Sequence, residues 1–421
     1  FFFVYCSWPT ACGIKQRELI IRCMRQGLRR KGMPNVFGHH VDGYTCIIII
    51  ITAVYSVLLY KWLKTDDRHT TNTNFTAPSL LSTRPSFRST SSAGAQFNFS
   101  QWVEDPSIDQ EPCCNFLQSL ATPLNPLRYR FGVDYQSCCS EATYNGSRVR
   151  PLRFVGGSPF DGKRFLKAMR AKRVVFVGDS LMRQTVTAMV CAIERTGTPP
   201  KRAVKPEKQP WDTTLPDDDQ LDFSAEYDDD TRVERVSMRK SSTETLTAVL
   251  GYADVVILNI GAWYRRTQRQ HYEQALVEAA EALKEFSAKP GKIGIIVDTF
   301  PMHFVTKRGS GDYFERTSYS QCTDVSPESY FGSGGDWRSR LIRRVAKRHG
   351  VPFMEITDIF LTRGDAHLEL RPKFKALGKK NPKLDCNHWC QRSSLWAPFV
   401  ARLQESLEAA ATAAPKSETD P

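Results

Sequence analysis

The chain has 421 residues, of which 41% are hydrophobic and 24% are charged, and its formal net charge at pH 7 is +13. This composition excludes a disordered chain and allows one large core with accessory segments. The positive charge would suit a nucleic-acid-binding protein, but much of it is concentrated ahead of an apolar segment, so we expect no nucleic acid as a partner.

Residues 44–63 form that apolar segment, which contains one charged residue, Lys61, and is long enough to cross a bilayer as a helix. Seven cations precede it: Lys15, Arg17, Arg22, Arg25, Arg29, Arg30 and Lys31. Because cations favour the cytosolic side, we predict a cytosolic tail over 1–43, a single-pass type II signal anchor over 44–63 and a lumenal body. A buried core helix and a cleaved signal peptide are the alternatives.

Two features beyond the anchor agree with a lumenal body. N-x-[ST] glycosylation sequons begin at Asn74, Asn98 and Asn145. Eight of the twelve cysteines also follow the anchor, at positions 113, 114, 138, 139, 191, 322, 386 and 390. An even number suits disulfides in an oxidising compartment. Zinc is the alternative, but the adjacent pairs 113–114 and 138–139 lack C-x-x-C spacing, so we predict no metal site.

The rest of the chain divides by composition. Residues 64–110 are rich in Ser, Thr, Asn and Pro, as a solvated stem would be. Residues 111–157 contain four cysteines and no clear periodicity, which indicates a disulfide-stapled collar. We assign 158–412 to the main domain and 413–421 to a tail. The stretch 217–230 contains seven aspartates without EF-hand spacing, so a solvated loop is favoured over a calcium site.

Strand and helix patterns alternate through the main domain. Strands are predicted at 173–177, 253–260, 294–299 and 353–356, and helices at 181–194, 268–288 and 336–349, the last closed by Gly350. This order predicts a three-layer α/β fold with a largely parallel sheet.

Ser180 follows the first of these strands, in the block Gly178-Asp179-Ser180, and opens a helix. Free backbone N–H groups and the positive end of the helix dipole stabilise an oxyanion at such a position, so Ser180 is a candidate nucleophile. The alternative is a helix cap with no catalytic role, and Gly-Asp-Ser alone is a weak motif.

The block Asp385-Cys386-Asn387-His388-Trp389-Cys390 supplies a candidate base. An imidazole serves as a base when a carboxylate holds its other nitrogen. Asp385 and His388 are three residues apart, which would place them on one face of a helical turn. A surface pair is the alternative.

A third block, Asn259-Ile260-Gly261-Ala262-Trp263, ends the second strand at the edge where open α/β sheets bind ligands. The Asn259 amide and the Gly261 N–H are candidate oxyanion donors. An ordinary Asn-x-Gly turn is the alternative.

Together these segments resemble the trichome birefringence-like and PC-esterase family of polysaccharide O-acetyltransferases, whose hallmarks are a GDS block, an N-x-G-x-W block and a D-C-x-H-W-C block. Similarity extends to residues 300–304 and 363–367, and spans about 111–407. Two departures are Ala262, where the family usually has histidine, and the segment 391–394. These bear on acceptor choice.

The resemblance implies an SGNH-like fold and a Golgi membrane enzyme that acetylates a polysaccharide or glycan through an acyl-serine. By this match Ser180 is the nucleophile, His388 the base and Asp385 its orienting carboxylate. The Ser180 N–H and Asn259 are the oxyanion donors. Gly178, Asp179, Arg183 and Trp263 are expected to support the site.

The resemblance also suggests that Cys322 pairs with Cys386 and that Cys191 and Cys390 are tied to the collar. We expect no bound cofactor, with acetyl-CoA or a derived donor as substrate. A polysaccharide acetylesterase is the main alternative, because both reactions share the acyl-serine, and a silent carbohydrate-binding protein is a further one.

Overall fold

The computed structural model describes residues 102–107, 114, 116, 143–144, 147–148, 150–206, 210–211, 215, 219–318, 321–368 and 385–413. The predicted tail, anchor and sequons and most of the stem and collar lie outside these ranges, so they stay predictions. Within the described ranges, no helix has both the length and the apolar character that a membrane crossing needs.

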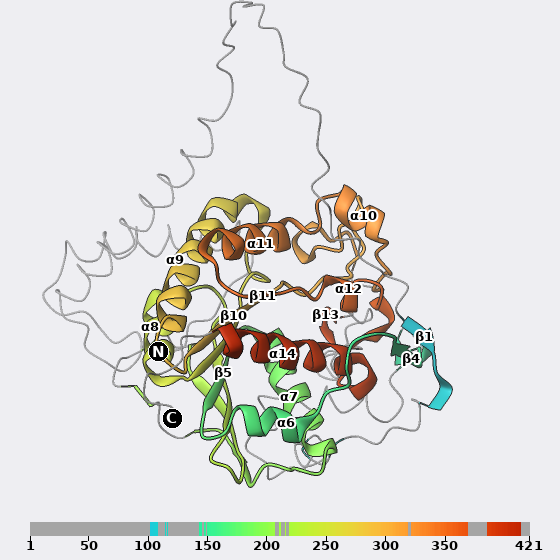
Figure 1. The fold of residues 1–421 in the computed structure, drawn as a ribbon. Helices are drawn as coiled ribbons and strands as arrows, with labels where there is room; N and C mark the ends of the chain where they lie inside the picture. Colours follow the sequence, from blue (N-terminus) through green and yellow to red (C-terminus); the bar gives the residue numbers. More distant parts are fainter. Residues whose placement is uncertain are drawn as a thin grey trace, which may run out of the picture. The chain divides into compact units, whose positions relative to one another are not determined.

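The described residues contain a central seven-stranded sheet with the order β11-β10-β9-β5-β8-β7-β6 (Figure 1). Its strands are β5 (Arg173–Gly178), β6 (Arg202–Val204), β7 (Leu221–Glu226), β8 (Arg232–Ser237), β9 (Val255–Asn259), β10 (Ile293–Val297) and β11 (Phe353–Met354). Neighbours from β11 to β8 are parallel, whereas β7 and β6 are antiparallel to their partners. The predicted largely parallel α/β sheet is confirmed.

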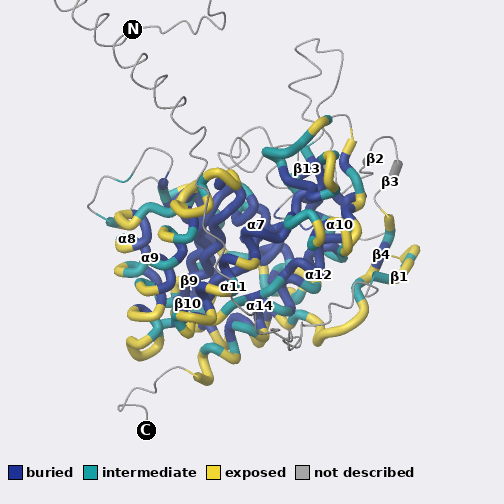
Figure 2. Tube along the Cα trace, turned by 90° about the horizontal axis from the view of Figure 1, so that it is seen from above, coloured by how far each residue is buried: buried dark blue, intermediate teal, exposed yellow. Residues whose placement is uncertain are grey.

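Helices cover both faces of this sheet (Figure 1). On one face lie α6 (Gly162–Ala168), α7 (Ser180–Arg195) and α14 (Ser393–Ala413); on the other lie α8 (Thr243–Tyr252), α9 (Arg269–Ser287) and α11 (Trp337–His349). Alternation along β5 explains the two layers, because Val174 and Phe176 pack in the first core and Val175 and Val177 in the second. Figure 2 shows the sheet and α7 buried between more exposed helices.

Shorter elements lie at the borders of this body. They are β1 (Trp102–Glu104), β2 (Thr143–Tyr144), β3 (Ser147–Arg148), β4 (Leu152–Phe154), α10 (Pro327–Gly332), α12 (Thr357–Phe360), β12 (His367–Leu368) and β13 (Asp385–Trp389). Three single-turn 3-10 helices lie within the described ranges, at Arg266–Gln268, Tyr313–Glu315 and Gly364–Ala366. β1 pairs with β4, and the Trp102 Nε1–H donates to the Ile359 carbonyl at 3.0 Å. The end of the predicted stem is therefore attached to the body.

Two local predictions are wrong. The acidic stretch 217–230 is not a solvated loop throughout, because residues 221–226 form the buried strand β7. Its apolar residues Leu221, Phe223 and Ala225 alternate with polar ones, and the partner strand β8 supplies Arg235 to neutralise Asp222. The segment 385–389 is a strand, not a helical turn, because it pairs with β12.

Candidate active site

A tight turn between β5 and α7 presents Ser180. Gly178 has a φ of +154°, and a Cβ there would stand 2.2 Å from the Asn259 carbonyl oxygen, so glycine is required. Asp179 then caps α7, because its carboxylate accepts a hydrogen bond from the Leu181 N–H at 2.9 Å. The hydroxyl of Ser180 is thus held at the first residue of the helix, beside the positive end of its dipole.

The side chain of His388 connects Ser180 with Asp385. Its Nε2 lies 2.6 Å from Ser180 Oγ, and its Nδ1 lies 2.7 Å from Asp385 Oδ2. Since Nδ1 faces a carboxylate, it carries the ring proton and leaves Nε2 as an acceptor for the hydroxyl proton. The expected convergence of these three side chains is confirmed as geometry, over a separation of 208 residues between His388 and Ser180. Their catalytic roles stay predictions.

The surroundings of Asp385 favour its ionised form. Burial would raise its pKa, but the charge of His388 and hydrogen bonds from the His388 ring and from the backbone N–H groups of Asn387 and His388 outweigh burial. They hold the pKa of this carboxyl well below its ordinary value. Asp385 can therefore orient the imidazole as an anion rather than exchange a proton with it.

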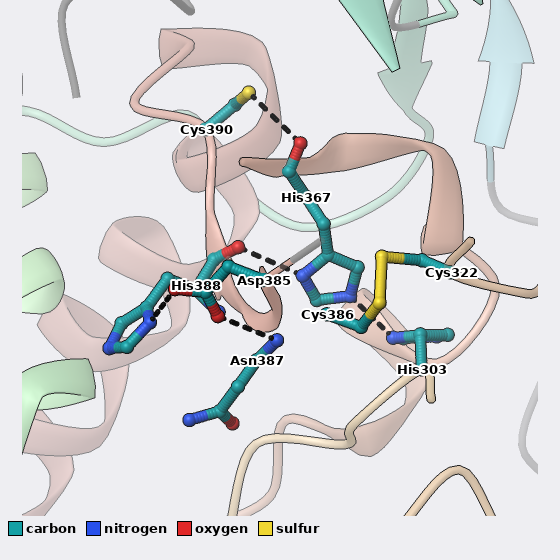
Figure 3. The surroundings of a disulfide bond; sticks show 8 residues. All are labelled: His303, Cys322, His367, Asp385, Cys386, Asn387, His388 and Cys390. Atoms are coloured by element: carbon teal, nitrogen blue, oxygen red, sulfur yellow. Dashed lines mark hydrogen bonds and ion pairs between the residues drawn. A yellow bond between two sulfur atoms is a disulfide. The ribbon is translucent and has the colours of Figure 1, made fainter. Parts of the chain in front are cut away.

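A disulfide fixes the strand that carries His388 (Figure 3). Cys322 is bonded to Cys386, with Cα atoms 5.3 Å apart, which confirms the predicted pairing. The His303 N–H also donates to the Cys386 carbonyl at 3.0 Å. Cys390 is disulfide-bonded too, and its predicted partner in the collar lies outside the described residues.

A second disulfide joins α7 to the collar. Cys191 is bonded to Cys114, with Cα atoms 5.5 Å apart. The predicted link between Cys191 and the 113–139 region is confirmed. The helix that begins at Ser180 is therefore covalently held at its far end as well.

Gln184, which the sequence reasoning missed, attaches β13 to the same helix. Its Oε1 accepts from the Trp389 N–H at 2.9 Å, its Nε2 donates to the Trp389 carbonyl, and its own carbonyl accepts from Gln391 Nε2 at 3.1 Å. Because Gln184 lies one turn after Ser180, this clamp fixes the separation of serine and histidine. The sequence did offer a signal for Gln184: it follows the candidate nucleophile by four residues, about one helical turn.

A buried arginine supports the turn from behind. Arg235, on β8, is fully buried and is ion-paired with Asp222 of β7. Its Nη2 donates to the carbonyls of Gly178 and Asp179, at 3.2 and 2.9 Å. Sequence reasoning missed this contact, because nothing in the pattern of β7 and β8 shows which charged residues face inward.

Two buried histidines lie under the His388 backbone (Figure 3). His367 Nδ1 contacts the His388 carbonyl at 2.9 Å, His367 Nε2 contacts His303 Nδ1 at 2.8 Å, and His303 Nε2 contacts the Leu361 carbonyl at 2.6 Å. These three hydrogen bonds require three ring protons, whereas two neutral imidazoles carry only two, so one ring would have to be protonated. Burial opposes this, because it lowers the pKa of both rings. The proton content of this pair decides whether the link from Leu361 to His388 is complete.

The oxyanion donors are only partly placed as predicted. The Ser180 N–H lies in the first turn of α7, where backbone donors have no partner within the helix. The Asn259 amide, however, is fully buried and donates to the carbonyls of Val297 and Asp298, at 3.3 and 2.6 Å. In this structure its Nδ2 is directed at the end of β10, and its role as an oxyanion donor stays a prediction. The role of the Gly261 N–H stays a prediction.

The remaining predicted support residues surround the turn. The positive charge of Arg183, one turn into α7, acts on the Asp179 carboxyl, whose pKa burial raises. Trp263 lies in the turn after β9 and is 43% exposed. In the described ranges, no cluster of three His, Cys, Asp or Glu side chains is arranged to hold a metal ion.

A mostly parallel α/β sheet that brings a serine, a histidine and an aspartate into one hydrogen-bonded series fits an SGNH-like acyl-ester enzyme. Residues 158–391, more than half of the chain, match the PC-Esterase family, described as a GDSL/SGNH-like acyl-esterase family found in Pmr5 and Cas1p. The chain belongs to the PC-esterase family, and the resemblance inferred from the motifs is confirmed.

Curated relatives agree with this family. Protein trichome birefringence-like 35 of Arabidopsis thaliana is 26% identical over 261 residues, covering 53% of this chain and 58% of the relative. Probable xylan O-acetyltransferase 10 of Oryza sativa subsp. japonica is 24% identical over 271 residues, covering 55% and 61%. The chain thus spans about three fifths of the length of these relatives. They support an acyl-transferring or esterase enzyme.

Proposed function

We propose that this protein is an O-acetyltransferase that transfers acetyl groups to polysaccharide hydroxyls through an acyl-serine on Ser180. The observation that carries the proposal is the unbroken series of hydrogen bonds from Asp385 to His388 to the Ser180 hydroxyl. The relative named as a probable xylan O-acetyltransferase makes a β-linked xylan a reasonable first acceptor to test.

The first half-reaction forms the acyl-enzyme. His388 Nε2 takes the Ser180 proton as Oγ attacks the acetyl carbonyl, and the negative charge of the tetrahedral intermediate is stabilised by the Ser180 N–H at the positive end of the α7 dipole. The C–O or C–S bond to the donor's leaving group then breaks, and His388 returns the proton to that group. Asp385 keeps the imidazolium oriented throughout.

The second half-reaction transfers the acetyl group. A sugar hydroxyl gives its proton to His388 Nε2 and attacks the acyl-serine; the Ser180 ester bond breaks, and Oγ recovers the proton. If water attacks instead, free acetate is the product and the enzyme is an acetylesterase. Acetyl-CoA or a derived donor is the proposed substrate of the first step, and a Golgi membrane with a lumenal catalytic body is the proposed location.

The test is to incubate the full chain with p-nitrophenyl acetate or acetyl-CoA and xylohexaose, and to measure acetylated glycan against free acetate. Mass spectrometry should find the acetyl group on Ser180, and Ser180→Ala should abolish both labelling and product. Ser333→Ala, which removes a hydroxyl at the end of α10, is the matched control and should retain activity. Acetylation of another residue, or an active Ser180→Ala variant, contradicts the proposal.

A further inference from the structure

The turn that follows β9 exposes an indole ring. Trp263 is 43% exposed, whereas its neighbours Ala262 and Tyr264 are buried. Among the phenylalanine, tyrosine and tryptophan side chains that the structure describes, no other is exposed. An exposed indole presents a flat apolar face together with a polar N–H, a combination that is enriched at interaction surfaces.

The exposure does not come from a loosely held loop. The Tyr264 N–H donates to the Gly261 carbonyl at 3.0 Å and closes the turn. Arg338 donates to the Tyr264 carbonyl at 2.6 Å and is itself paired with Asp312 at 2.8 Å, with both charged side chains buried. The Tyr264 ring also packs on Tyr272, with centroids 4.6 Å apart. The indole of Trp263 is therefore presented by a fixed backbone.

A cation from another loop lies against this ring. The guanidinium of Arg239, two residues beyond the end of β8, is 5.5 Å from the Trp263 ring centroid. Trp263 retains its exposure with Arg239 in this position. The pair thus combines an apolar ring face with a group that donates several hydrogen bonds.

The two loops flank the strand that leads to Ser180. β5 lies between β8 and β9, and Gly178 is paired with Ser237 on one side and with Asn259 on the other. The Met238 N–H donates to the Gly178 carbonyl at 2.8 Å, so Arg239 directly follows a residue bonded to the serine turn. The contact between Arg239 and Trp263 therefore joins loops on both sides of the strand end that carries Ser180.

We propose that Trp263 and Arg239 form a subsite that binds one sugar residue of the acceptor glycan beside Ser180. This inference rests on the proposed transferase function. One face of a pyranose ring presents C–H groups with slight positive charge, which pack on the negative π-face of an indole. The guanidinium next to that ring donates to sugar hydroxyls, or in a bidentate manner to the carboxylate of a uronic acid.

The subsite has a defined effect on the reaction. It binds the acceptor and takes no part in forming the acyl-enzyme from a small ester. Loss of the ring should therefore change the acceptor concentration needed for half-maximal transfer and leave the first half-reaction unaffected. This separation distinguishes a binding residue from one that only maintains the fold.

Kinetics of the full chain test the separation. Trp263→Ala should release p-nitrophenol from p-nitrophenyl acetate within about twofold of the wild-type rate, and should raise the KM for xylohexaose by about tenfold. Trp263→Phe, which keeps an aromatic face, should stay within about threefold. Val155→Ala removes a similarly exposed apolar group outside this edge and is the matched control. An unchanged KM, or an equal loss in both half-reactions, overturns the subsite.

Direct binding tests the subsite without chemistry. Calorimetric titration of Ser180→Ala protein with xylohexaose, mannohexaose and a galacturonic acid hexamer should show binding of at least one glycan. Adding Trp263→Ala should weaken it by about tenfold, and adding Arg239→Ala should weaken the galacturonic acid hexamer more than the neutral glycans. No binding of any of the three, or binding that is unchanged by Trp263→Ala, refutes the inference. Failure of wild-type protein to acylate Ser180 would instead refute the proposed function and leave this titration valid.

Discussion

Gly178 and Asn259 face each other at the ends of β5 and β9, and a Cβ on Gly178 would stand 2.2 Å from the carbonyl oxygen of Asn259. The same Cβ would lie 2.6 Å from Met182 Cγ, in the first turn of α7. The strand, its neighbour and the helix therefore approach so closely at this point that no side chain fits. This close approach allows the chain to turn sharply enough to place Ser180 at the start of the helix.

We predict that Gly178→Ala destabilises the protein by about 2–4 kcal/mol and reduces acyl transfer by at least about tenfold, because the added methyl displaces the turn and strains a positive φ. Denaturant unfolding and p-nitrophenyl acetate turnover measure the two effects. Gly251→Ala is the control: nothing lies within 4 Å of its Cβ and it is in helix α8, so the variant should be as stable as wild type or slightly more stable. A fully active, stable Gly178→Ala protein would contradict this account of the turn.

Arg235 should prove to be a positioning residue. Replacing it with methionine leaves Asp222 buried without its cation and removes the donor to the carbonyls of Gly178 and Asp179. We expect a loss of about 3–5 kcal/mol in unfolding free energy and a lower kcat. Arg344→Met, which breaks an exposed pair with Glu273, should cost less than about 1 kcal/mol.

The double variant Arg235→Met, Asp222→Leu separates stability from positioning. It should recover most of the lost stability, since no uncompensated charge remains, but it should keep the low kcat, because the Arg235 guanidinium no longer joins the carbonyls of Gly178 and Asp179. Recovery of both stability and kcat would show that Arg235 acts through stability alone.

The sequence could predict the parts of this site that depend on residues close together in the chain. β-branched runs predicted β5, β9 and β10, and the residue types after each strand predicted Ser180 at the sheet edge. Alternation of Leu221, Phe223 and Ala225 also encodes β7, but the surrounding aspartates obscured it. When the sequence of such a strand is considered without the neighbouring strand that neutralises its charges, its composition predicts a loop.

Long-range contacts could not be read in the same way. From the sequence, the Asn259 amide could face Ser180 or donate to the end of β10. The packing of the sheet determines that it donates to the end of β10. The contacts of Gln184, Arg235 and His367 join residues that are 21 to 205 positions apart in the sequence, and no periodicity marks them. These residues hold the geometry that the motifs only imply.

His367 offers a direct test of that supporting network. We expect His367→Phe to keep the ring volume but remove the contact with the His388 carbonyl, lowering kcat by about tenfold with little change in KM for a small ester, and destabilising the fold by about 1–3 kcal/mol. His271→Phe, at an exposed position of α9, should remain within twofold of wild type. A change in KM alone would show that His367 does not position His388.

The last prediction concerns the pH dependence of stability and follows from Asp385. Its native pKa is held well below the ordinary value near 3.8, so the unfolded chain takes up this proton at a higher pH than the folded protein does. The stabilisation is therefore complete above the ordinary value and is lost progressively as the pH falls from that value towards the lower native pKa. Once the unfolded state is protonated and the native state is not, this one group contributes a slope of about 1.4 kcal/mol per pH unit.

Chemical denaturation of the wild type and of Asp385→Asn at half-unit intervals between pH 6 and pH 3 measures that contribution. Other carboxyls whose pKa values are lowered, such as Asp312 and Asp365, titrate in both proteins and cancel in the comparison. The two curves should run parallel from pH 6 to about pH 5 and then converge, because only the wild type loses the Asp385 contribution as acid is added. Asp385→Asn should also lose most acyl transfer at pH 7, since an amide cannot hold the imidazole in the tautomer that accepts the Ser180 proton. Parallel curves down to pH 3 would show that the carboxylate contributes no pH-dependent stability, and an active Asp385→Asn enzyme would remove Asp385 from the mechanism.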